Sequence, residues 1–287
     1  MALLASLPPE VLLEIMQFLP INGLLDFGLT CKRYHAIQQR SLTSLRLGVF
    51  HSKLSGMVNL MEATANNSCL HSVQMILPKQ GPKNKECVIF KQNRSVQEVV
   101  AKYQNSLRDL ELAMWEFQEG TASLLAGLGN LRHLSIRLDH PHTRHPAIKQ
   151  GFWQEAPGST IWNHLAPKAG RAPALGRLQS LNLERAGVTD YQLKLLLKSN
   201  PQIRELRLRK CFNLTKETFK YLASSKLGGR LEILHFTMVD SSHIDDELLE
   251  YIGVMPKLKV SACVLMTMNA TANWDNAVII LPRVWAY

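Results

Sequence analysis

A pattern of apolar residues, L-x-x-L-x-L, recurs along most of this 287-residue chain and constrains its fold more than any other feature. Copies begin at Leu107, Leu131, Leu178, Ile203 and Leu231, and outside one longer gap they are 24, 25 or 28 residues apart. An internal period of this length is typical of repeat architectures, in which each unit buries its apolar face only against its neighbours. The sequence therefore predicts strands that stack into a curved solenoid.

Helices are predicted between these strands. After each of the last three copies an apolar residue has partners five and eight positions later: Val188, Leu193 and Leu196; Leu214, Phe219 and Leu222; Ile244, Leu249 and Ile252. Thr189 and Thr215 are N-cap candidates for the first two helices. Thr189 with Gln192 also has the spacing of a capping box. The repeating unit is therefore predicted to be a strand followed by a helix.

One copy of the repeat contains a cysteine that indicates the type of repeat. Residues 203–215 read I-x-x-L-x-L-x-x-C-x-x-L-T, which resembles the cysteine-containing leucine-rich repeat. Further copies of the strand pattern begin at Leu42 and Leu70, so the resemblance implies an α/β leucine-rich-repeat solenoid over residues 41–287. Cys211 is then expected to be a buried small apolar group rather than a reactive thiol.

Polar and basic residues are predicted on the exposed face of this sheet. Strand side chains alternate in direction, so inward leucines leave the intervening residues facing outward. Five of these outward residues would form a basic column that suits a carboxylate or phosphate of a bound segment: His133, Arg137, Arg207, Arg209 and His235. A solvated strand face without a specific partner is the alternative, because exposed charges are the default.

Two regions depart from the repeat pattern. Residues 139–176 are rich in proline and glycine and contain Trp153 and Trp162, which favours a loop insertion over a decayed repeat. Residues 267–287 contain the strand-like run AVIILP, and we expect them to cover the open edge of the last repeat.

The N-terminal stretch SLPPEVLLEIMQFLP, residues 6–20, is predicted to be a helix rather than an export signal. No Lys or Arg precedes Lys32, and Glu10 and Glu14 interrupt the apolar run. Its apolar residues have helical spacing and form one stripe: Val11, Leu12, Ile15, Phe18 and Leu19.

Two further short helices are expected, one from a cap at about Asn22 and one from about Thr30. Gly28 lies inside the first of them and leaves its length open, since glycine lowers helix propensity. Three helices in so few residues cannot enclose a stable core alone. Their apolar residues must therefore be shared with the rest of the chain or with a partner.

Residues 6–40 resemble an F-box. The resemblance rests on the opening Leu-Pro-x-Glu, the apolar helix, the pair Leu24-Leu25, and Cys31-Lys32 followed by an aromatic residue. It implies a three-helix F-box over residues 1–40 that binds the Skp adaptor, which in turn connects to a cullin scaffold and a ubiquitin-conjugating enzyme. Carried over residue by residue, the resemblance places these side chains against the adaptor: Leu7, Pro8, Leu12, Ile15, Leu19, Leu25, Leu29, Cys31 and Tyr34. The alternative is an N-terminal cap that only packs on the following domain.

The composition indicates the kind of partner. A net charge of +10 and a pI of about 9.5 favour an acidic partner. The sequence lacks the blocks of like charge and the interleaved aromatic and basic residues that are typical of nucleic-acid binding.

No apolar run reaches the length of a membrane span. Five cysteines without a C-x-x-C pair indicate a reducing compartment, so we expect a cytoplasmic or nuclear protein.

No pattern in the chain predicts catalysis. The cluster of His140, His142 and His145 is interrupted by proline and favours a polar loop over a metal site. Phosphate-binding, dinucleotide-binding, zinc-protease and nucleophile-elbow motifs do not occur in the sequence. We expect no cofactor, no metal and no enzymatic activity.

These observations favour one function over two others. The leading interpretation is the substrate-recognition subunit of a Skp-cullin-F-box ubiquitin ligase, whose F-box binds the adaptor and whose repeats bind an acidic or phosphorylated protein. A leucine-rich scaffold whose F-box-like helices serve another partner is the alternative. Nucleic-acid binding rests on net charge alone.

Overall fold

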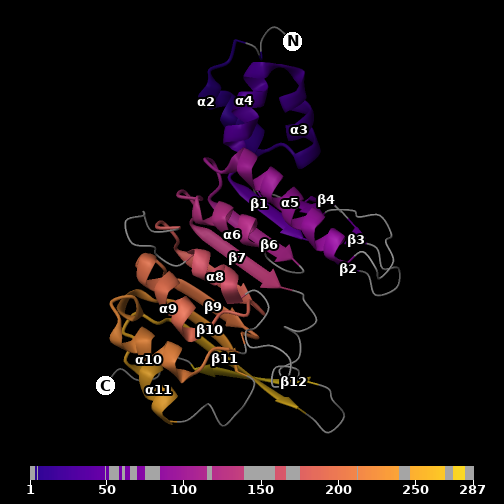
Figure 1. Ribbon diagram of the computed structural model, residues 1–287. Coiled ribbons are helices and arrows are strands. Elements are labelled where there is room, and N and C mark those ends of the chain that lie inside the picture. The colour runs from indigo at the N-terminus through magenta and orange to yellow at the C-terminus, as the bar shows by residue number, and fades with distance from the viewer. Residues whose placement is uncertain are drawn as a thin grey trace. The chain divides into compact units, whose positions relative to one another are not determined.

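The computed structural model describes residues 4, 6–48, 50–51, 58–59, 62–64, 70–74, 85–114, 118–138, 159–165, 175–211, 213–238, 246–268 and 274–281. The chain forms two compact units, Met1–Ala113 and Met114–Tyr287 (Figure 1). Both units contain helices and strands, so the predicted mixed α/β class is confirmed.

The first unit opens with three short helices, which are α2 (Pro9–Gln17), α3 (Ile21–Thr30) and α4 (Lys32–Ser41). The elements that follow are β1 (Ser44–Gly48), β2 (Phe50–His51), β3 (Val58–Asn59), β4 (Glu62–Thr64), β5 (Leu70–Gln74), α5 (Lys85–Tyr103) and β6 (Asp109–Met114). Strand β1 lies between β5 and β6 and is parallel to both, while β4 pairs antiparallel with β5. Strands β2 and β3 form a separate antiparallel pair.

The starts of α3 and α4 differ from the sequence prediction. Helix α3 begins at Ile21, directly after Pro20, rather than at a cap on Asn22. Helix α4 begins after Cys31, whose sulfur accepts a hydrogen bond from the Tyr34 N–H at 3.5 Å. Thr30 is instead the last residue of α3. Its hydroxyl donates back to a carbonyl of that helix, which is a local bond that competes with capping the next helix.

Gly28 allows α3 and α4 to approach each other closely. The helix runs through Gly28 without a break, so the glycine does not shorten it. A Cβ atom added at this position would lie 3.1 Å from Cγ of Gln38 on α4. The lower helix propensity of glycine is thus offset by the close packing of the two helices.

The second unit alternates helices and strands. In chain order it contains α6 (Glu119–Ala126), β7 (His133–Leu138), α8 (Ser159–Leu165), β8 (Ser180–Glu184), α9 (Asp190–Ser199), β9 (Glu205–Arg209), α10 (Lys216–Ser224), the short helix η4 (Gly228–Arg230), β10 (Ile233–Met238), α11 (Asp246–Gly253), β11 (Val260–Met268) and β12 (Trp274–Leu281). The strands follow one another across the sheet in sequence order from β7 to β12. Neighbours from β7 to β11 are parallel, and β12 pairs antiparallel with β11.

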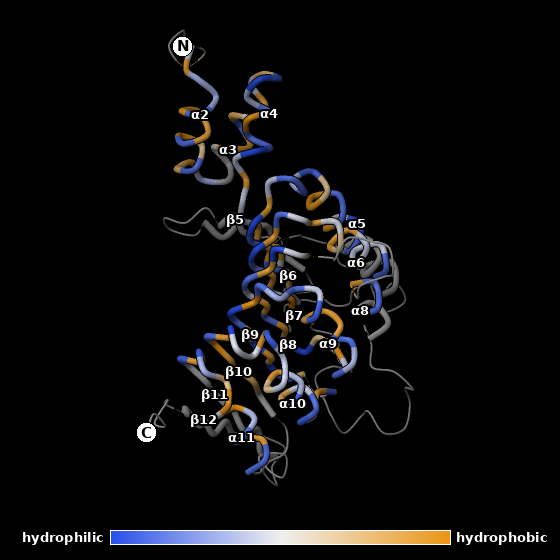
Figure 2. Tube along the Cα trace, turned by 90° about the vertical axis from the view of Figure 1, so that its left-hand side faces the viewer, coloured by the Kyte–Doolittle hydropathy of each residue, from blue (hydrophilic) through white to orange (hydrophobic). Residues whose placement is uncertain are grey.

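The strand register places equivalent leucines side by side. Leu181 lies opposite Leu134 on one side and Leu206 on the other, and Leu206 lies opposite Leu234. All four side chains are buried. Figure 2 shows α6, α8 and α9 on one side of β7 to β9, which is the side that the buried leucines must face. The predicted alternation of inward leucines and outward polar residues is therefore confirmed in these strands.

The helix prediction holds for α9 and α10 but is wrong at one position of α11. Thr189 and Gln192 form the expected capping box, with bonds of 3.1 and 3.4 Å. On α11, however, Leu249 is 42% exposed, and Leu248 is fully buried in its place. Leu248 and Ile252 are four residues apart and therefore share the inward face of the helix.

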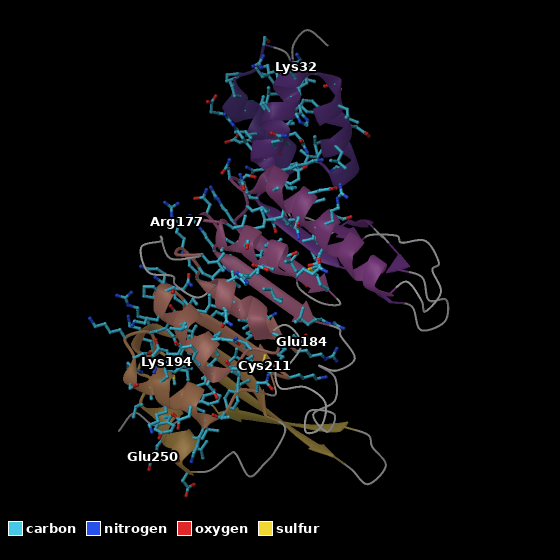
Figure 3. All side chains as sticks on the ribbon, viewed as in Figure 1. Lys32, Arg177, Glu184, Lys194, Cys211 and Glu250 are labelled. Atoms are coloured by element: carbon cyan, nitrogen blue, oxygen red, sulfur yellow. The ribbon has the colours of Figure 1, made fainter. Side chains whose placement is uncertain are left out.

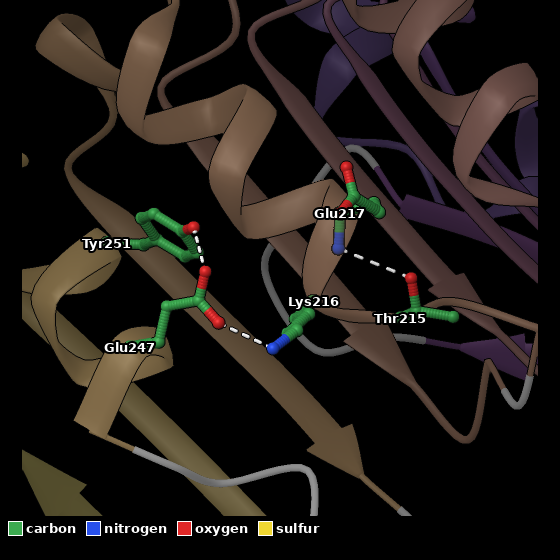
Figure 4. Close-up of polar contacts among 5 residues, drawn as sticks. All are labelled: Thr215, Lys216, Glu217, Glu247 and Tyr251. Atoms are coloured by element: carbon green, nitrogen blue, oxygen red, sulfur yellow. Dashed lines mark hydrogen bonds and ion pairs between the residues drawn. The ribbon is translucent and has the colours of Figure 1, made fainter.

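Polar contacts connect neighbouring helices of the second unit. The Thr215 hydroxyl caps α10 by accepting from the Glu217 N–H, and the carboxylate of Glu247 on α11 accepts from Lys216 and from the Tyr251 hydroxyl (Figure 4). Asp190 on α9 accepts hydrogen bonds from the backbone and hydroxyl of Thr215, each at 2.9 Å. Such contacts between neighbouring helices of the second unit fix the spacing of these helices.

The region predicted as a loop insertion contains a helix. Residues 159–165 form α8, which contacts α6 and α9. Trp162 is buried, and its indole N–H donates to the Ala186 carbonyl at 2.7 Å. This aromatic anchor makes α8 part of the helical layer, so the loop prediction is wrong for these residues. The histidine cluster at 140–145 and Trp153 lie outside the described residues.

The run AVIILP lies mostly in β12, which pairs over its own full length with Ser261–Met268 of β11 at the edge of the sheet. None of the helices in the described ranges is long and apolar enough to cross a membrane.

Candidate functional site

Helix α2 has two apolar faces rather than the single predicted stripe. Leu12 and Met16 are four residues apart and fully buried, so they form the inner face. Val11, Ile15 and Phe18 follow the same helical spacing on a different side and are exposed, Phe18 by 88%. A globular helix normally keeps such residues covered, and the outer face is therefore a candidate contact surface.

Helix α3 repeats this division. Leu24 and Gly28 are buried, and Gly28 packs against Gln38 of α4. Leu25 and Leu29, again four residues apart, point away from the core, and Leu29 is 82% exposed. We refer to Val11, Ile15, Phe18, Leu25 and Leu29 together as the outer apolar residues.

The structure distributes the nine predicted adaptor-facing residues over three environments. Five are exposed: Pro8, Ile15, Leu25, Leu29 and Cys31. Leu7, Leu19 and Tyr34 are half-buried, and the Tyr34 ring stacks on Phe27 at 4.3 Å. Leu12 is fully buried in the helical core and takes no part in the exposed surface.

Val11 and Phe18 were not among the predicted contact residues, although both are exposed. The signal was present in the sequence, because Val11, Ile15 and Phe18 lie at positions i, i+4 and i+7. A second apolar row, Leu12 and Met16, is offset from it by one residue. Two such rows on one helix indicate a core face and a contact face.

Hydrogen bonds hold the three helices to one another and to the rest of the first unit. The Arg33 guanidinium on α4 donates to the Leu7 carbonyl at 2.7 Å, which fixes the segment before α2. The Ser106 hydroxyl lies 2.7 and 3.0 Å from the carbonyl oxygens of Leu42 and Gln39 at the end of α4. The outer apolar residues are therefore presented on an anchored scaffold.

Comparison with known protein families identifies this helical segment. Residues 4–43 match the F-box-like family model, so the chain carries an F-box-like domain at its N-terminal end. The match supports the resemblance seen in the sequence, and F-box domains commonly bind the Skp adaptor. A search among curated proteins found no match for this chain.

The five basic residues predicted for the sheet do not form a single column. Arg207 and His235 are register partners on β9 and β10. Arg137 and Arg209 belong to a different row, in which Glu184 of β8 lies between them. His133 starts a third row, which continues through Ser180. The expectation of one continuous basic column is therefore wrong, because its members occupy three positions along the strands.

Electrostatic interactions nevertheless group three of these side chains. Burial lowers the pKa of His235, and the nearby positive charges of Arg209 and Arg207 lower it further. Arg207 itself pairs with Glu205 two residues earlier on the same strand, with 2.6 Å between its Nε and the carboxylate. We call Arg207, Arg209 and His235, together with Lys210 directly after β9, the β9 basic cluster.

Among the described residues, no group of three or more His, Cys, Asp and Glu side chains has the arrangement of a metal site. Cys211 is buried, as predicted, and its thiol points to the Leu183 carbonyl at 3.5 Å.

Proposed function

We propose that the chain is the substrate-recognition subunit of a Skp-cullin-F-box ubiquitin ligase. The observation that carries this proposal is the pair of highly exposed side chains, Phe18 and Leu29, within the F-box-like domain. Burying one large apolar side chain contributes about 1.5–3 kcal/mol. A Skp adaptor that covers both would bury the two most exposed large apolar side chains described in this domain.

The second unit is proposed to bind the protein that becomes ubiquitinated. We infer that its strand-helix units are leucine-rich repeats in a curved solenoid, which is supported by the parallel register of the leucines. Repeats of this kind offer one long sheet face to a partner. The β9 basic cluster lies on that face and suits an acidic segment.

The proposed contribution of the chain to ubiquitination is proximity rather than chemistry. It would hold a target next to the ubiquitin-conjugating enzyme that adaptor and cullin recruit, and no residue of its own would react. We place this activity in the cytoplasm or nucleus. The odd number of cysteines and the free thiols of Cys31 and Cys211 are consistent with a reducing compartment.

Size-exclusion chromatography of the full chain, co-expressed with a Skp adaptor and then mixed with a cullin, tests the proposal. We expect a three-component peak. If the complex of chain and adaptor does not bind cullin, the result would favour the alternative function, a scaffold that binds the adaptor outside a ligase. Failure of the folded chain to bind any Skp adaptor would remove the ligase function altogether.

A further inference from the structure

Positive charge is concentrated where β7, β8 and β9 end. Figure 3 labels Glu184, the last residue of β8, and Cys211, which follows the end of β9. Glu184 has Arg137 and Arg209 as its register partners on the two flanking strands. With Arg185, Arg207 and Lys210, the described residues here include five cations, against the carboxylates of Glu184 and Glu205. The described residues therefore give this end of the sheet a net positive charge.

Two cations of this region stand in a strained backbone conformation. Arg185 and Lys210 follow β8 and β9 at equivalent positions and have φ angles of 53° and 52°. The loops that carry them are joined, since the Arg185 N–H donates to the Arg209 carbonyl at 2.9 Å. At such a φ angle a side chain crowds its own backbone, and glycine avoids this cost because it has no Cβ atom. Long basic side chains at both positions suggest that the charge is needed there.

Lys210 and Arg209 form no direct ion pair with another described residue. Glu184 is the one described carboxylate that acts on Lys210 from a distance. The Nε atom of Arg209 is buried and has no hydrogen-bond partner among the described residues. Burial and the charge of Arg185 lower the pKa of Lys210, while Glu184 only partly opposes them. A buried donor and crowded cations are both stabilised when an anion binds.

We propose that the β9 basic cluster binds the phosphate group of a phosphorylated segment in the partner protein. This inference rests on the proposed function and names the chemistry of its target. A phosphate group carries about −1.5 to −2 charge at pH 7 and three acceptor oxygens, whereas a carboxylate carries one charge and two oxygens. Arg209 and Lys210 together supply two positive charges, and Arg207 remains partly neutralised by Glu205. The cluster therefore matches a phosphate dianion better than a carboxylate.

The test is fluorescence anisotropy of the full chain with three labelled pools of degenerate peptides. The pools share their random flanks and differ in the central residue, which is phosphoserine, serine or glutamate. We expect the phosphoserine pool to bind at least tenfold more tightly than the glutamate pool. Equal binding of the phosphoserine and glutamate pools, or equal binding of phosphoserine and serine, would overturn the proposal.

Lys210→Gly is the most informative variant, because it removes a cation and relieves the backbone strain at the same time. The fold should be as stable as before or more so, while phosphoserine binding weakens at least tenfold. Arg209→Met, which keeps the apolar stem, should have the same effect on binding. Lys220→Gln on the exposed side of α10 is the control, because it makes the same change in net charge. Phosphoserine binding that survives Lys210→Gly and Arg209→Met would contradict the assignment.

Adaptor binding is measured separately on the same proteins. If the chain binds phosphoserine but not the adaptor, the phosphate site at the β9 basic cluster is supported and the ligase function is contradicted. If the chain binds the adaptor without preferring phosphoserine, the ligase function is supported and the phosphate site is contradicted.

Discussion

Gln38 on α4 donates a hydrogen bond from its Nε2 to the hydroxyl of Tyr103 at the end of α5, at 3.0 Å, and both side chains are buried. The bond joins the F-box-like domain to the helix that follows it in the same unit. Replacing Tyr103 by Phe would leave a buried amide without its acceptor. We expect Tyr103→Phe to lower the free energy of unfolding by about 1–3 kcal/mol, measured by urea denaturation.

A double-mutant cycle with Gln38→Leu isolates this bond from the loss of packing. The double variant should lose less stability than the sum of the two single variants, because both partners are then gone. Strict additivity would mean that the bond contributes nothing.

Gly28 and Gly23 lie on the same helix and give opposite predictions. Alanine at Gly28 would place its Cβ 3.1 Å from Gln38 Cγ, whereas at Gly23 the nearest atom is Pro20 Cδ at 3.5 Å, an ordinary contact. Gly23→Ala should therefore stabilise the protein by up to about 1 kcal/mol through helix propensity. Gly28→Ala should destabilise it by about 1 kcal/mol or more, because overpacking outweighs that gain. Thermal unfolding of the two variants compares them directly, and equal effects would refute the close approach of α3 and α4.

The capping box of α9 gives a third stability prediction. Thr189→Ala removes the acceptor for the Gln192 N–H and should lower the free energy of unfolding by about 1 kcal/mol. Thr189→Ser keeps the hydroxyl and should behave like the native protein. A loss of similar size in both variants would assign the effect to the Thr189 methyl group instead of the cap.

His235 makes stability depend on pH in a predictable direction. Its folded-state pKa lies below the ordinary value of 6.5, because of burial and the charges of Arg209 and Arg207. Its register partner on the other side, Ala262, is neutral. As the pH falls below about 6.5, the unfolded state takes up the proton more readily than the folded state, so stability decreases. Above that value this residue has no effect.

Chemical denaturation between pH 5 and pH 8 in a phosphate-free buffer measures this dependence. The native protein should lose stability more steeply below pH 6.5 than His235→Gln. Parallel curves for the two proteins would show that His235 titrates normally in the folded state.

The periodicity of apolar residues predicted which side chains of the strands and helices face the core. The leucines of β7 to β10 and the inward residues of α9 and α10 follow from spacing alone, because each must face the core. Spacing failed to predict the inward residue of α11, where two adjacent leucines were available and Leu248 rather than Leu249 is buried. It also failed at α8, where one buried tryptophan anchors a seven-residue helix that proline and glycine on both sides conceal.

The candidate site was predictable as a segment but not residue by residue. Family resemblance located the three helices, yet it assigned Leu12 to the surface, and this residue belongs to the core. The basic residues were correctly assigned to one face of the sheet. Their division into rows depends on strand register, which the sequence of each strand does not specify.

Isothermal titration of the full chain with a Skp adaptor tests the central claim most directly. The test variant is Phe18→Ser with Leu29→Ser, and Leu249→Ser on α11 is the control because it also replaces an exposed leucine. We predict that the native chain and the control bind alike. The double variant should bind at least a hundredfold more weakly, since it loses two contacts worth about 1.5–3 kcal/mol each and 1.4 kcal/mol is tenfold. Unchanged affinity of a folded double variant would contradict the assignment of the outer apolar residues as the docking surface.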